Sequence, residues 1–245
     1  MKISLQTQSH KRWVINMRFS FLRCPAPTSK AYDILAAMPA IAFYVFAASK
    51  IAAGIARRLD SIDLQAIDPA IAFPLLAQAS SLLFVLMVLV MIALRGPAKS
   101  KAAGLMPRMM AICGTYFSVA LVWLPLQPMS VTISLLSFCL IVGGMGFSAF
   151  SLLHLGRSFS LMAEARRLVT DGPYAFIRHP LYLGEAISFL GVTLQYRSAL
   201  AFLIMALQFA FQFQRMANEE EVLAKQFPEY DDYRLRTARI VPGVL

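Results

Sequence analysis

The sequence predicts an all-α protein, a polytopic bundle of transmembrane helices. Of its 245 residues, 58% are hydrophobic and only 15% are charged, whereas an average soluble domain is roughly 45–50% apolar and about 25% charged. The apolar residues gather in runs close to the roughly 20 residues that a membrane-spanning helix needs. Basic residues lie mainly between these runs, a pattern typical of loops that face the cytoplasm.

The net charge of +10 is explained better by basic loops at an anionic membrane surface than by nucleic-acid binding, so no nucleic-acid partner is predicted. The three cysteines show no paired spacing and are predicted to be reduced and structural. The three histidines have no ligand partner at a useful spacing, so the sequence predicts no metal site. These residues are Cys24, Cys113, Cys139, His10, His154 and His179.

Four apolar runs are predicted to cross the membrane: residues 34–56, 70–94, 109–126 and 130–153. A fifth apolar stretch, residues 181–213, is broken by polar residues at 195–198 into two arms, each short for a full crossing. We therefore expect a helical hairpin in this stretch. Small residues at 143–148 predict close packing between helices rather than a nucleotide-binding loop, because no βαβ unit surrounds them.

The chain is expected to have three parts. A basic N-terminal arm (1–33) precedes the transmembrane helices (34–153), and residues 154–245 hold the candidate catalytic and cofactor-binding residues, the hairpin and a charged tail. The excess of Lys and Arg predicts that the arm, the loop 95–108, the segment 154–180 and the tail lie on the cytoplasmic side of a bacterial inner membrane. The loop 57–69 and the turn 126–129 suit the far side, and both termini are expected in the cytoplasm.

Candidate site residues concentrate between positions 155 and 221, where polar and turn-forming residues interrupt the apolar runs. Gly172-Pro173 is a turn signal and Pro180 suits the first position of a helix, which makes His179 the N-cap. The free backbone N–H groups of the first helical turn, which contains Tyr182, can bind an anion such as a carboxylate. Read alone, His179 is also typical of a histidine at the membrane interface, and Tyr182 of an aromatic belt.

Arg215 and Glu219 are spaced i, i+4 and share one face of a helix. A surface ion pair explains this spacing equally well, but the pair lies where the last apolar arm meets the cytoplasm. There a buried Glu219 can hold a cationic or hydroxyl-bearing cofactor group, and a buried Arg215 can bind an acidic substrate group. Glu220 and Glu221 are predicted to be solvated, and Glu185 is either a partner of the site or a charge at the interface.

The motifs of this region, in chain order, are Leu155-Gly156-Arg157-Ser158-Phe159-Ser160, Leu168-Val169-x-x-Gly172-Pro173-Tyr174, Arg178-His179-Pro180-x-Tyr182-x-Gly184, Glu219-Glu220-x-x-Leu223 and Phe227-x-Glu229-Tyr230-x-x-Tyr233, followed by Pro242. Over about residues 150–245 their order and spacing resemble the isoprenylcysteine carboxyl methyltransferase family. The related phospholipid N-methyltransferases share much of the pattern, whereas the first 150 residues add only compatible hydrophobicity.

The resemblance implies an integral membrane methyltransferase that uses S-adenosylmethionine and takes a lipophilic substrate from the surrounding membrane lipids. It implies that Arg215 contacts the substrate and that Arg215, Glu219 and His179 serve catalysis. The cofactor-binding residues that it implies are Arg167, Leu168, Val169, Tyr174, His179, Pro180, Leu181, Tyr182 and Glu219. The pair Arg166-Arg167 departs from the family, whose members often carry a polar or His-containing pair at this place.

The expected acceptor is the carboxylate of an isoprenylcysteine-like lipid, which needs no general base. A phospholipid amine such as phosphatidylethanolamine, or a small thiol, is the alternative, and either must first lose a proton, for which the sequence offers no obvious acceptor. Methyl transfer from a sulfonium depends on alignment and exclusion of water more than on acid–base groups. Two other classes stay open: NADPH-dependent membrane sterol reductases, which share the pattern from Arg178 to Glu185, and a non-catalytic scaffold or transporter.

Overall fold

The computed structural model of the chain describes residues 30–60 and 69–243, so the predicted arm 1–33 lies almost wholly outside the described residues. Within these ranges the chain is built from helices and one two-stranded sheet, which confirms the predicted all-α class. The elements are α1 (Lys30–Leu59), α2 (Pro69–Leu94), β1 (Ser100–Lys101), α3 (Leu105–Tyr116), η1 (Phe117–Trp123), α4 (Val131–Leu155), η2 (Gly156–Ser158), β2 (Glu164–Ala165), η3 (Gly172–Ala175), α5 (Pro180–Leu194), α6 (Ala199–Gln226) and α7 (Tyr230–Arg236), where η denotes a 3-10 helix.

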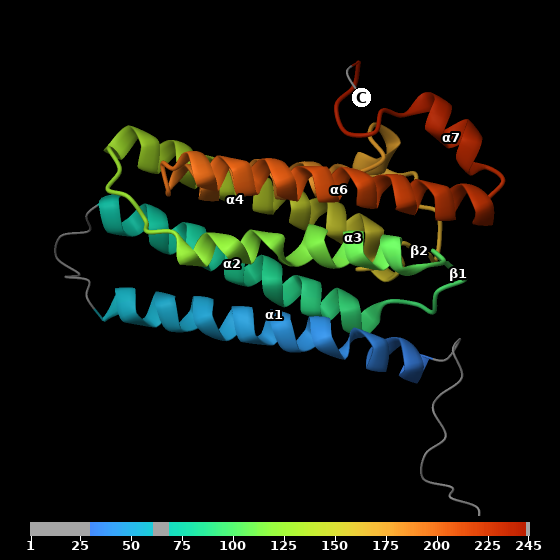
Figure 1. Cartoon of the computed structure of the whole chain (residues 1–245), viewed down its shortest axis with the longest axis horizontal. Coiled ribbons are helices and arrows are strands. Elements are labelled where there is room, and N and C mark those ends of the chain that lie inside the picture. The colour runs from blue at the N-terminus through green and yellow to red at the C-terminus, as the bar shows by residue number, and fades with distance from the viewer. Residues whose placement is uncertain (1–29, 61–68, 244–245) are drawn as a thin grey trace, which may run out of the picture.

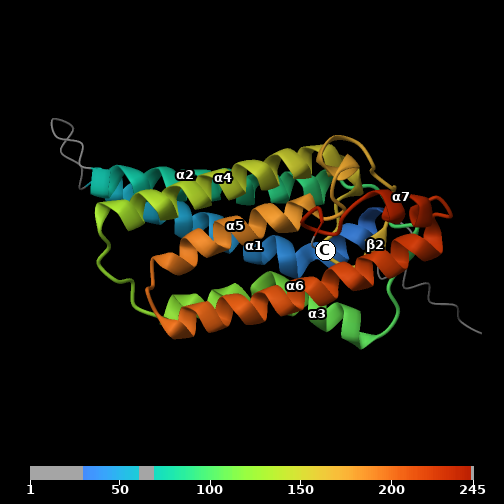
Figure 2. The same ribbon diagram turned by 90° about the horizontal axis from the view of Figure 1, so that it is seen from above.

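The long helices lie alongside one another in an elongated bundle (Figures 1 and 2). In Figure 2, α5 lies between α2 and α4 on one side and α3 and α6 on the other. The small sheet and α7 lie at one end of the bundle, and the turns that precede α4 and α6 lie at the opposite end. The segments 95–108, 154–180 and the described part of the tail therefore share one end, as predicted, while the side of the membrane that this end faces stays a prediction.

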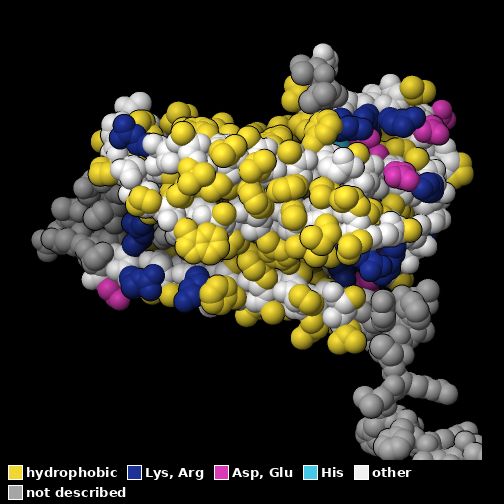
Figure 3. Space-filling view, in the orientation of Figure 1, with side chains coloured by type: hydrophobic (Ala, Val, Ile, Leu, Met, Phe, Trp, Pro, Cys, Tyr) yellow, Lys and Arg dark blue, Asp and Glu magenta, His cyan; other side chains and the backbone are white. Residues whose placement is uncertain are grey.

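Among the described residues, four helices are long and apolar enough to cross a membrane, and their bounds are Asp33–Leu59, Ala72–Leu94, Val131–Ser158 and Ala199–Gln226. In Figure 3, hydrophobic side chains cover the middle of the visible face and charged side chains gather toward its two ends. An apolar belt between charged ends is the surface that a bilayer requires. The chain is an integral membrane protein.

The helices that provide the four long spans differ in part from those predicted. The predicted third span, residues 109–126, is not one continuous α-helix, because α3 ends at Tyr116 and η1 continues to Trp123. At about 1.5 Å of rise per α-helical residue and about 2.0 Å per 3-10 residue, the two together still extend roughly 30 Å.

The helices α5 and α6 form the predicted hairpin, but its second arm is much longer than expected. The apolar run ends at Phe213, whereas α6 has 28 residues and continues to Gln226. The residues after Phe213 include Glu, Ala, Lys and Met, which have high helix propensity although they are not all apolar. Hydrophobicity therefore underestimated the length of this helix.

Small residues allow α4 and α5 to pack closely, as the run at 143–148 predicted. A Cβ added to Gly144 would collide with the backbone nitrogen of Ser188 and would lie 2.6 Å from the carbonyl oxygen of Gly184. A Cβ at Gly143 would meet nothing within 4 Å. One glycine of the run thus lies at the contact between the helices, and its neighbour faces away from it.

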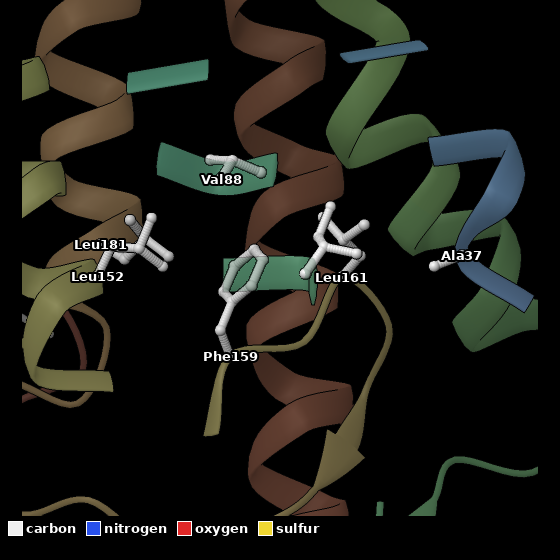
Figure 4. Close-up of a cluster of buried hydrophobic side chains, with 7 residues drawn as sticks. Ala37, Val88, Leu152, Phe159, Leu161 and Leu181 are labelled. Atoms are coloured by element: carbon white, nitrogen blue, oxygen red, sulfur yellow. The ribbon is translucent and has the colours of Figure 1, made fainter. Parts of the chain in front are cut away.

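A buried hydrophobic cluster joins α1, α2, α4 and α5 to the loop that follows η2 (Figure 4). Phe159 and Leu161 of this loop are buried against side chains of the bundle. This contact holds the start of the 155–180 segment against the helices. The members of the cluster are Ala37, Val88, Ile92, Leu152, Phe159, Leu161 and Leu181.

Candidate functional site

The segment between α4 and α5 crosses the end of the bundle and carries most of the predicted site residues. Its strand β2 pairs antiparallel with β1. It then turns at Gly172, whose φ of +56° lies in the left-handed region that favours glycine. A Cβ at this position would also collide with the imidazole of His154. The predicted turn at Gly172-Pro173 is confirmed, and η3 forms there.

The C-terminal tail fixes the turn that leads into α5. The backbone N–H of Arg178 donates to the carbonyl of Ala238 (2.8 Å), and that of His179 donates to the carbonyl of Arg239 (3.0 Å). The helix α5 begins at Pro180 with His179 at its N-cap position, as predicted. Pro180 has no N–H group, and the N–H of Leu183 donates to the carbonyl of His179 (3.2 Å), so Leu181 and Tyr182 have the first-turn N–H groups that lack a partner within the helix.

Glu220 is the centre of a buried ionic cluster. Its carboxylate accepts hydrogen bonds from Nε of Arg178 (2.9 Å) and Nη2 of Arg239 (2.6 Å), and it lies 3.1 Å from Nε2 of His179. Glu220 is only 5% exposed, so the prediction that it is solvated is wrong. The reason is that the tail folds back against the end of α6 and brings Arg239 with it. Glu221 is exposed, as predicted.

Glu219 belongs to a second cluster, which joins α5 to α6 and α3. Its Oε1 accepts hydrogen bonds from the hydroxyl of Tyr182 (2.5 Å) and from Nε of Arg215 (3.2 Å). The guanidinium of Arg215 lies over the Tyr182 ring, 5.2 Å from its centroid. It also donates to Oγ1 of Thr115 (3.2 Å) and to the carbonyl of Ser160 (3.4 Å). Arg215 is 6% exposed, so this pair is not a surface ion pair.

Two cavities meet at this second cluster. The first, which we call the loop-side cavity, lies against the 155–182 segment and the end of α6. Pro180, one of the nine residues that the resemblance assigns to the cofactor, is fully buried and does not line it. The other eight line the cavity together: Arg167, Leu168, Val169, Tyr174, His179, Leu181, Tyr182 and Glu219. Their common location is a finding, and their role in binding stays a prediction.

The second cavity, which we call the bundle cavity, lies among the helices and has a volume of about 210 Å³. Helices α1 to α6 all contribute to its wall, and Arg215 and Glu185 line it. Phe159, Leu181 and Tyr182 line both cavities, so these side chains lie at the boundary between them. Local motifs do not show which helices pack against one another, so the sequence did not predict this cavity.

Tyr230 also lines the loop-side cavity, although sequence reasoning did not assign it to the site. Its hydroxyl is buried and has no hydrogen-bond partner among the described residues. Burial, with the nearby charge of Glu220, raises the pKa of the Tyr230 hydroxyl above its ordinary value. The hydroxyl therefore stays protonated at neutral pH and can donate to a ligand. The motif that ends in Tyr233 contains this residue, but only the folded tail brings it to the cavity.

Arg166 is the second residue that the sequence did not assign. Its Nη2 donates to the carboxylates of Asp33 (2.8 Å) and Glu164 (2.6 Å), and Nε of Arg95 lies 3.0 Å from Asp33. This buried network ties the start of α1 to β2. Nε and Nη1 of Arg166 are buried without a partner among the described residues. Since the side chain lines the loop-side cavity, these N–H groups suit an anionic ligand group.

Comparison with known proteins shows which family the region around the two cavities resembles. Residues 132–230 match the model of the phospholipid methyltransferase family, a stretch that contains all but the first residue of α4, all of α5 and α6, and most of the wall of the loop-side cavity. This part of the chain resembles membrane methyltransferases that act on phospholipids or isoprenylcysteine. The resemblance predicted from the motifs is thereby confirmed.

Three curated proteins are similar to part of the chain. The chain is 36% identical over 80 residues to the nickel-cobalt-cadmium resistance protein NccN of Alcaligenes xylosoxydans xylosoxydans, covering 32% of this chain and 38% of that protein. It is 34% identical over 103 residues to the cobalt-zinc-cadmium resistance protein CzcN of Cupriavidus metallidurans, covering 40% and 48%. It is 33% identical over 99 residues to the protein-S-isoprenylcysteine O-methyltransferase of Schizosaccharomyces pombe, covering 38% and 42%. The matched stretch therefore spans less than half the length of each relative.

Proposed function

We propose that this protein is an S-adenosylmethionine-dependent methyltransferase whose acceptor is a lipophilic molecule from the membrane. The observation that carries the proposal is the junction of two cavities at Tyr182, one lined by polar loop residues and one among apolar helices. Methyl transfer requires a donor and an acceptor to meet in line, with water excluded. The family match over residues 132–230 supports the same class of reaction.

The loop-side cavity offers groups that suit each part of S-adenosylmethionine. Glu219 is an anion for the cationic amino group or sulfonium, and the two Arg166 nitrogens that lack a partner among the described residues suit the carboxylate. Leu168 and Val169 supply apolar surface for the adenine ring, and the Tyr230 hydroxyl, which also lacks a partner in the described part of the chain, can donate to an acceptor atom of the nucleoside. When bound, the cofactor supplies an electrophilic methyl group on a sulfonium.

The remaining residues align the site. In this proposal Tyr182 orients the carboxylate of Glu219 through their short hydrogen bond, and Phe159 and Leu181 exclude water from the junction. The imidazole of His179 is held by Glu220, and so His179 positions the start of α5 in addition to the cofactor contact that the resemblance implies.

The finer expectation of an isoprenylcysteine-like carboxylate acceptor rests on the resemblance and on Arg215. This residue lines the bundle cavity, and three of its five N–H groups donate to Glu219, Thr115 and Ser160. Two N–H groups thus remain for an acceptor carboxylate. A phospholipid amine or a small thiol stays the alternative acceptor. The methyltransferase among the relatives supports methyl transfer over reduction by NADPH.

Calorimetric titration of the purified protein in lipid nanodiscs tests this proposal. We expect binding of S-adenosylmethionine and S-adenosylhomocysteine and no binding of NADPH. A folded protein that binds neither adenosyl compound contradicts the proposal. Incubation with radiolabelled S-adenosylmethionine and total membrane lipid, followed by mass spectrometry, then identifies the product. Release of the label by alkali indicates a methyl ester, whereas stable label indicates transfer to nitrogen or sulfur.

A further inference from the structure

The bundle cavity contains a carboxylate that the proposed cofactor site does not use. The titratable or charged side chains that line it are Tyr44 of α1, Tyr182 and Glu185 of α5, and Arg215 of α6. The lining residues from α2, α3 and α4 are apolar or hydroxyl-bearing. Arg215 is paired with Glu219, and Glu185 forms no ion pair among the described residues.

Two glutamines lie beside Glu185 and have hydrogen-bonding capacity to spare. Nε2 of Gln212 donates to Oε2 of Glu185 (3.0 Å), and Nε2 of Gln208 donates to the carbonyl of Gly114. The Oε1 atoms of both glutamines are buried and have no partner among the described residues. A buried acceptor without a donor is unfavourable, so these oxygens favour a ligand that brings hydrogen-bond donors.

The two glutamines lie on the same face of α6 as Arg215 and Glu219, which reach the proposed cofactor site. Gln208, Gln212, Arg215 and Glu219 follow one another at intervals of four, three and four residues, which places them on one face of α6. This stripe runs from the interior of the bundle to the boundary with the loop-side cavity. An acceptor in the bundle cavity therefore lies along the stripe, and its reacting group approaches the boundary at Tyr182.

We propose that Glu185 is a catalytic residue on the acceptor side, which binds the donor-bearing group of the methyl acceptor together with Gln208 and Gln212 and takes its proton. The inference rests on the proposed methyltransferase function. It selects an acceptor with an N–H or S–H group, because a carboxylate acceptor brings no hydrogen-bond donor for Glu185 or for the Oε1 atoms of Gln208 and Gln212. It also supplies the proton acceptor that the sequence did not reveal.

The step balances without a further reactant. The acceptor first gives a proton to a carboxylate oxygen of Glu185, which leaves a lone pair on its nitrogen or a thiolate on its sulfur. This electron pair would then attack the methyl carbon as the carbon–sulfur bond of the cofactor breaks. The electron pair of that bond would stay on the cofactor sulfur as a neutral thioether.

The test compares three probes with the same chain, namely octylamine, octanethiol and octanoate, with the protein in nanodiscs. The variant Glu185→Gln keeps the shape and the contact with Gln212 but cannot take a proton, and Glu185→Asp keeps the acid. Glu221→Gln serves as a matched control, because Glu221 is exposed. The readouts are the initial methylation rate between pH 6 and 9.5, the dissociation constant of octylamine on protein loaded with S-adenosylhomocysteine, and the affinity for S-adenosylhomocysteine itself.

We expect the wild-type protein to methylate octylamine or octanethiol in preference to octanoate. In Glu185→Gln the rate should fall by about 100-fold, the usual contribution of a general base, and octylamine should bind at least about 10-fold more weakly, as after loss of a charged partner. The remaining rate should rise with pH, because solvent must then take the proton, and Glu185→Asp should restore part of it. Affinity for S-adenosylhomocysteine should be unchanged, which also shows that the variant is folded.

Preference for octanoate, or a Glu185→Gln rate within twofold of wild type, overturns the inference and leaves the proposed function intact. If the adenosyl compound binds but no probe is methylated, the inference is tested instead with the labelled product formed from total membrane lipid. An ester overturns the inference, and a stable label lost in Glu185→Gln supports it. Failure to bind either adenosyl compound overturns the proposed function and the inference with it. If Glu185→Gln does not fold, the rate and pH profile of Glu185→Asp decide in the same way.

Discussion

The loop-side cavity and the bundle cavity are built from different parts of the chain. The first draws most of its wall from the continuous segment 155–182 and the rest from the end of α6 and from α7. The wall of the second runs from Tyr44 of α1 to Ile240 in the tail and takes side chains from six helices. The first cavity is therefore encoded locally, in motifs with fixed spacing, and the second by packing between distant segments.

The two cavities also differ in how their charges are balanced. Behind the loop-side cavity, Glu220 is matched by Arg178 and Arg239. At its boundary Glu219 is matched by Arg215. In the bundle cavity Glu185 has a glutamine as its hydrogen-bonded partner and no ion pair of its own among the described residues. Paired charges are typical of a rigid frame, and a buried carboxyl group without an ion pair is typical of a functional site.

The largest effect is expected where the frame of the loop-side cavity is broken. Replacing Glu220 with Gln leaves two arginines without their carboxylate, and such a loss costs about 3–5 kcal/mol for a fully buried pair. Since Arg239 is partly exposed, we expect the unfolding free energy to fall by about 3 kcal/mol, measured by denaturant titration in detergent. Glu221→Gln should change it by less than about 0.5 kcal/mol. Equal effects of the two variants would contradict the buried cluster.

The next-largest expected effect tests which of the two cavities Glu219 serves. Glu219→Gln removes the carboxylate at the boundary, and we expect S-adenosylmethionine to bind about 100-fold more weakly, as for loss of one partner of a buried charge pair. Calorimetry measures this affinity, with Glu221→Gln again as the control. An unchanged affinity would show that Glu219 serves the bundle cavity rather than the cofactor.

A smaller effect is expected at the contact between α4 and α5. Gly144→Ala should lower the unfolding free energy by about 1–3 kcal/mol, because its Cβ meets the backbone of α5. The matched variant Gly143→Ala faces open space and should be neutral or slightly stabilising. Thermal unfolding compares the two. If both are tolerated equally, the close approach of these helices is contradicted.

The smallest effect is expected from one hydroxyl in the loop-side cavity. Tyr230→Phe removes a buried donor that has no partner among the described residues, so stability should be unchanged while the affinity for S-adenosylmethionine falls by about 1 kcal/mol, or roughly fivefold. Tyr233→Phe is the matched control, because that hydroxyl donates to the carbonyl of Tyr174 (2.7 Å) and its loss should lower stability. An affinity unaffected by Tyr230→Phe would remove this residue from the proposed site.

Local patterns predicted much of the fold and much of the candidate site. The N-cap position of His179 followed from Pro180, and the shared face of Arg215 and Glu219 followed from their spacing. Both depend on helix geometry within a few residues, which spacing records directly. The break between α3 and η1 did not follow in this way, because hydrophobicity is the same in either kind of helix.

Two adjacent glutamates have surroundings that their spacing in the sequence does not predict. Glu219 and Glu220 are neighbours in sequence, yet one faces Tyr182 at the cavity boundary and the other faces the arginines of the returning tail. Successive positions on a helix point about 100° apart, and the sequence does not record what each direction will meet.

The sequence by itself determined that the chain enters a membrane, where most of its apolar helices begin, and which motifs gather before α5 and at the end of α6. Hydrophobic runs and fixed spacings carry that information because they act over a few turns. Only the tertiary structure decided that Glu220 is buried, that Tyr230 reaches the loop-side cavity, and that Glu185 lies beside two glutamines in the bundle cavity. These outcomes depend on contacts between residues far apart in the chain, which form only when the helices pack and the tail folds back.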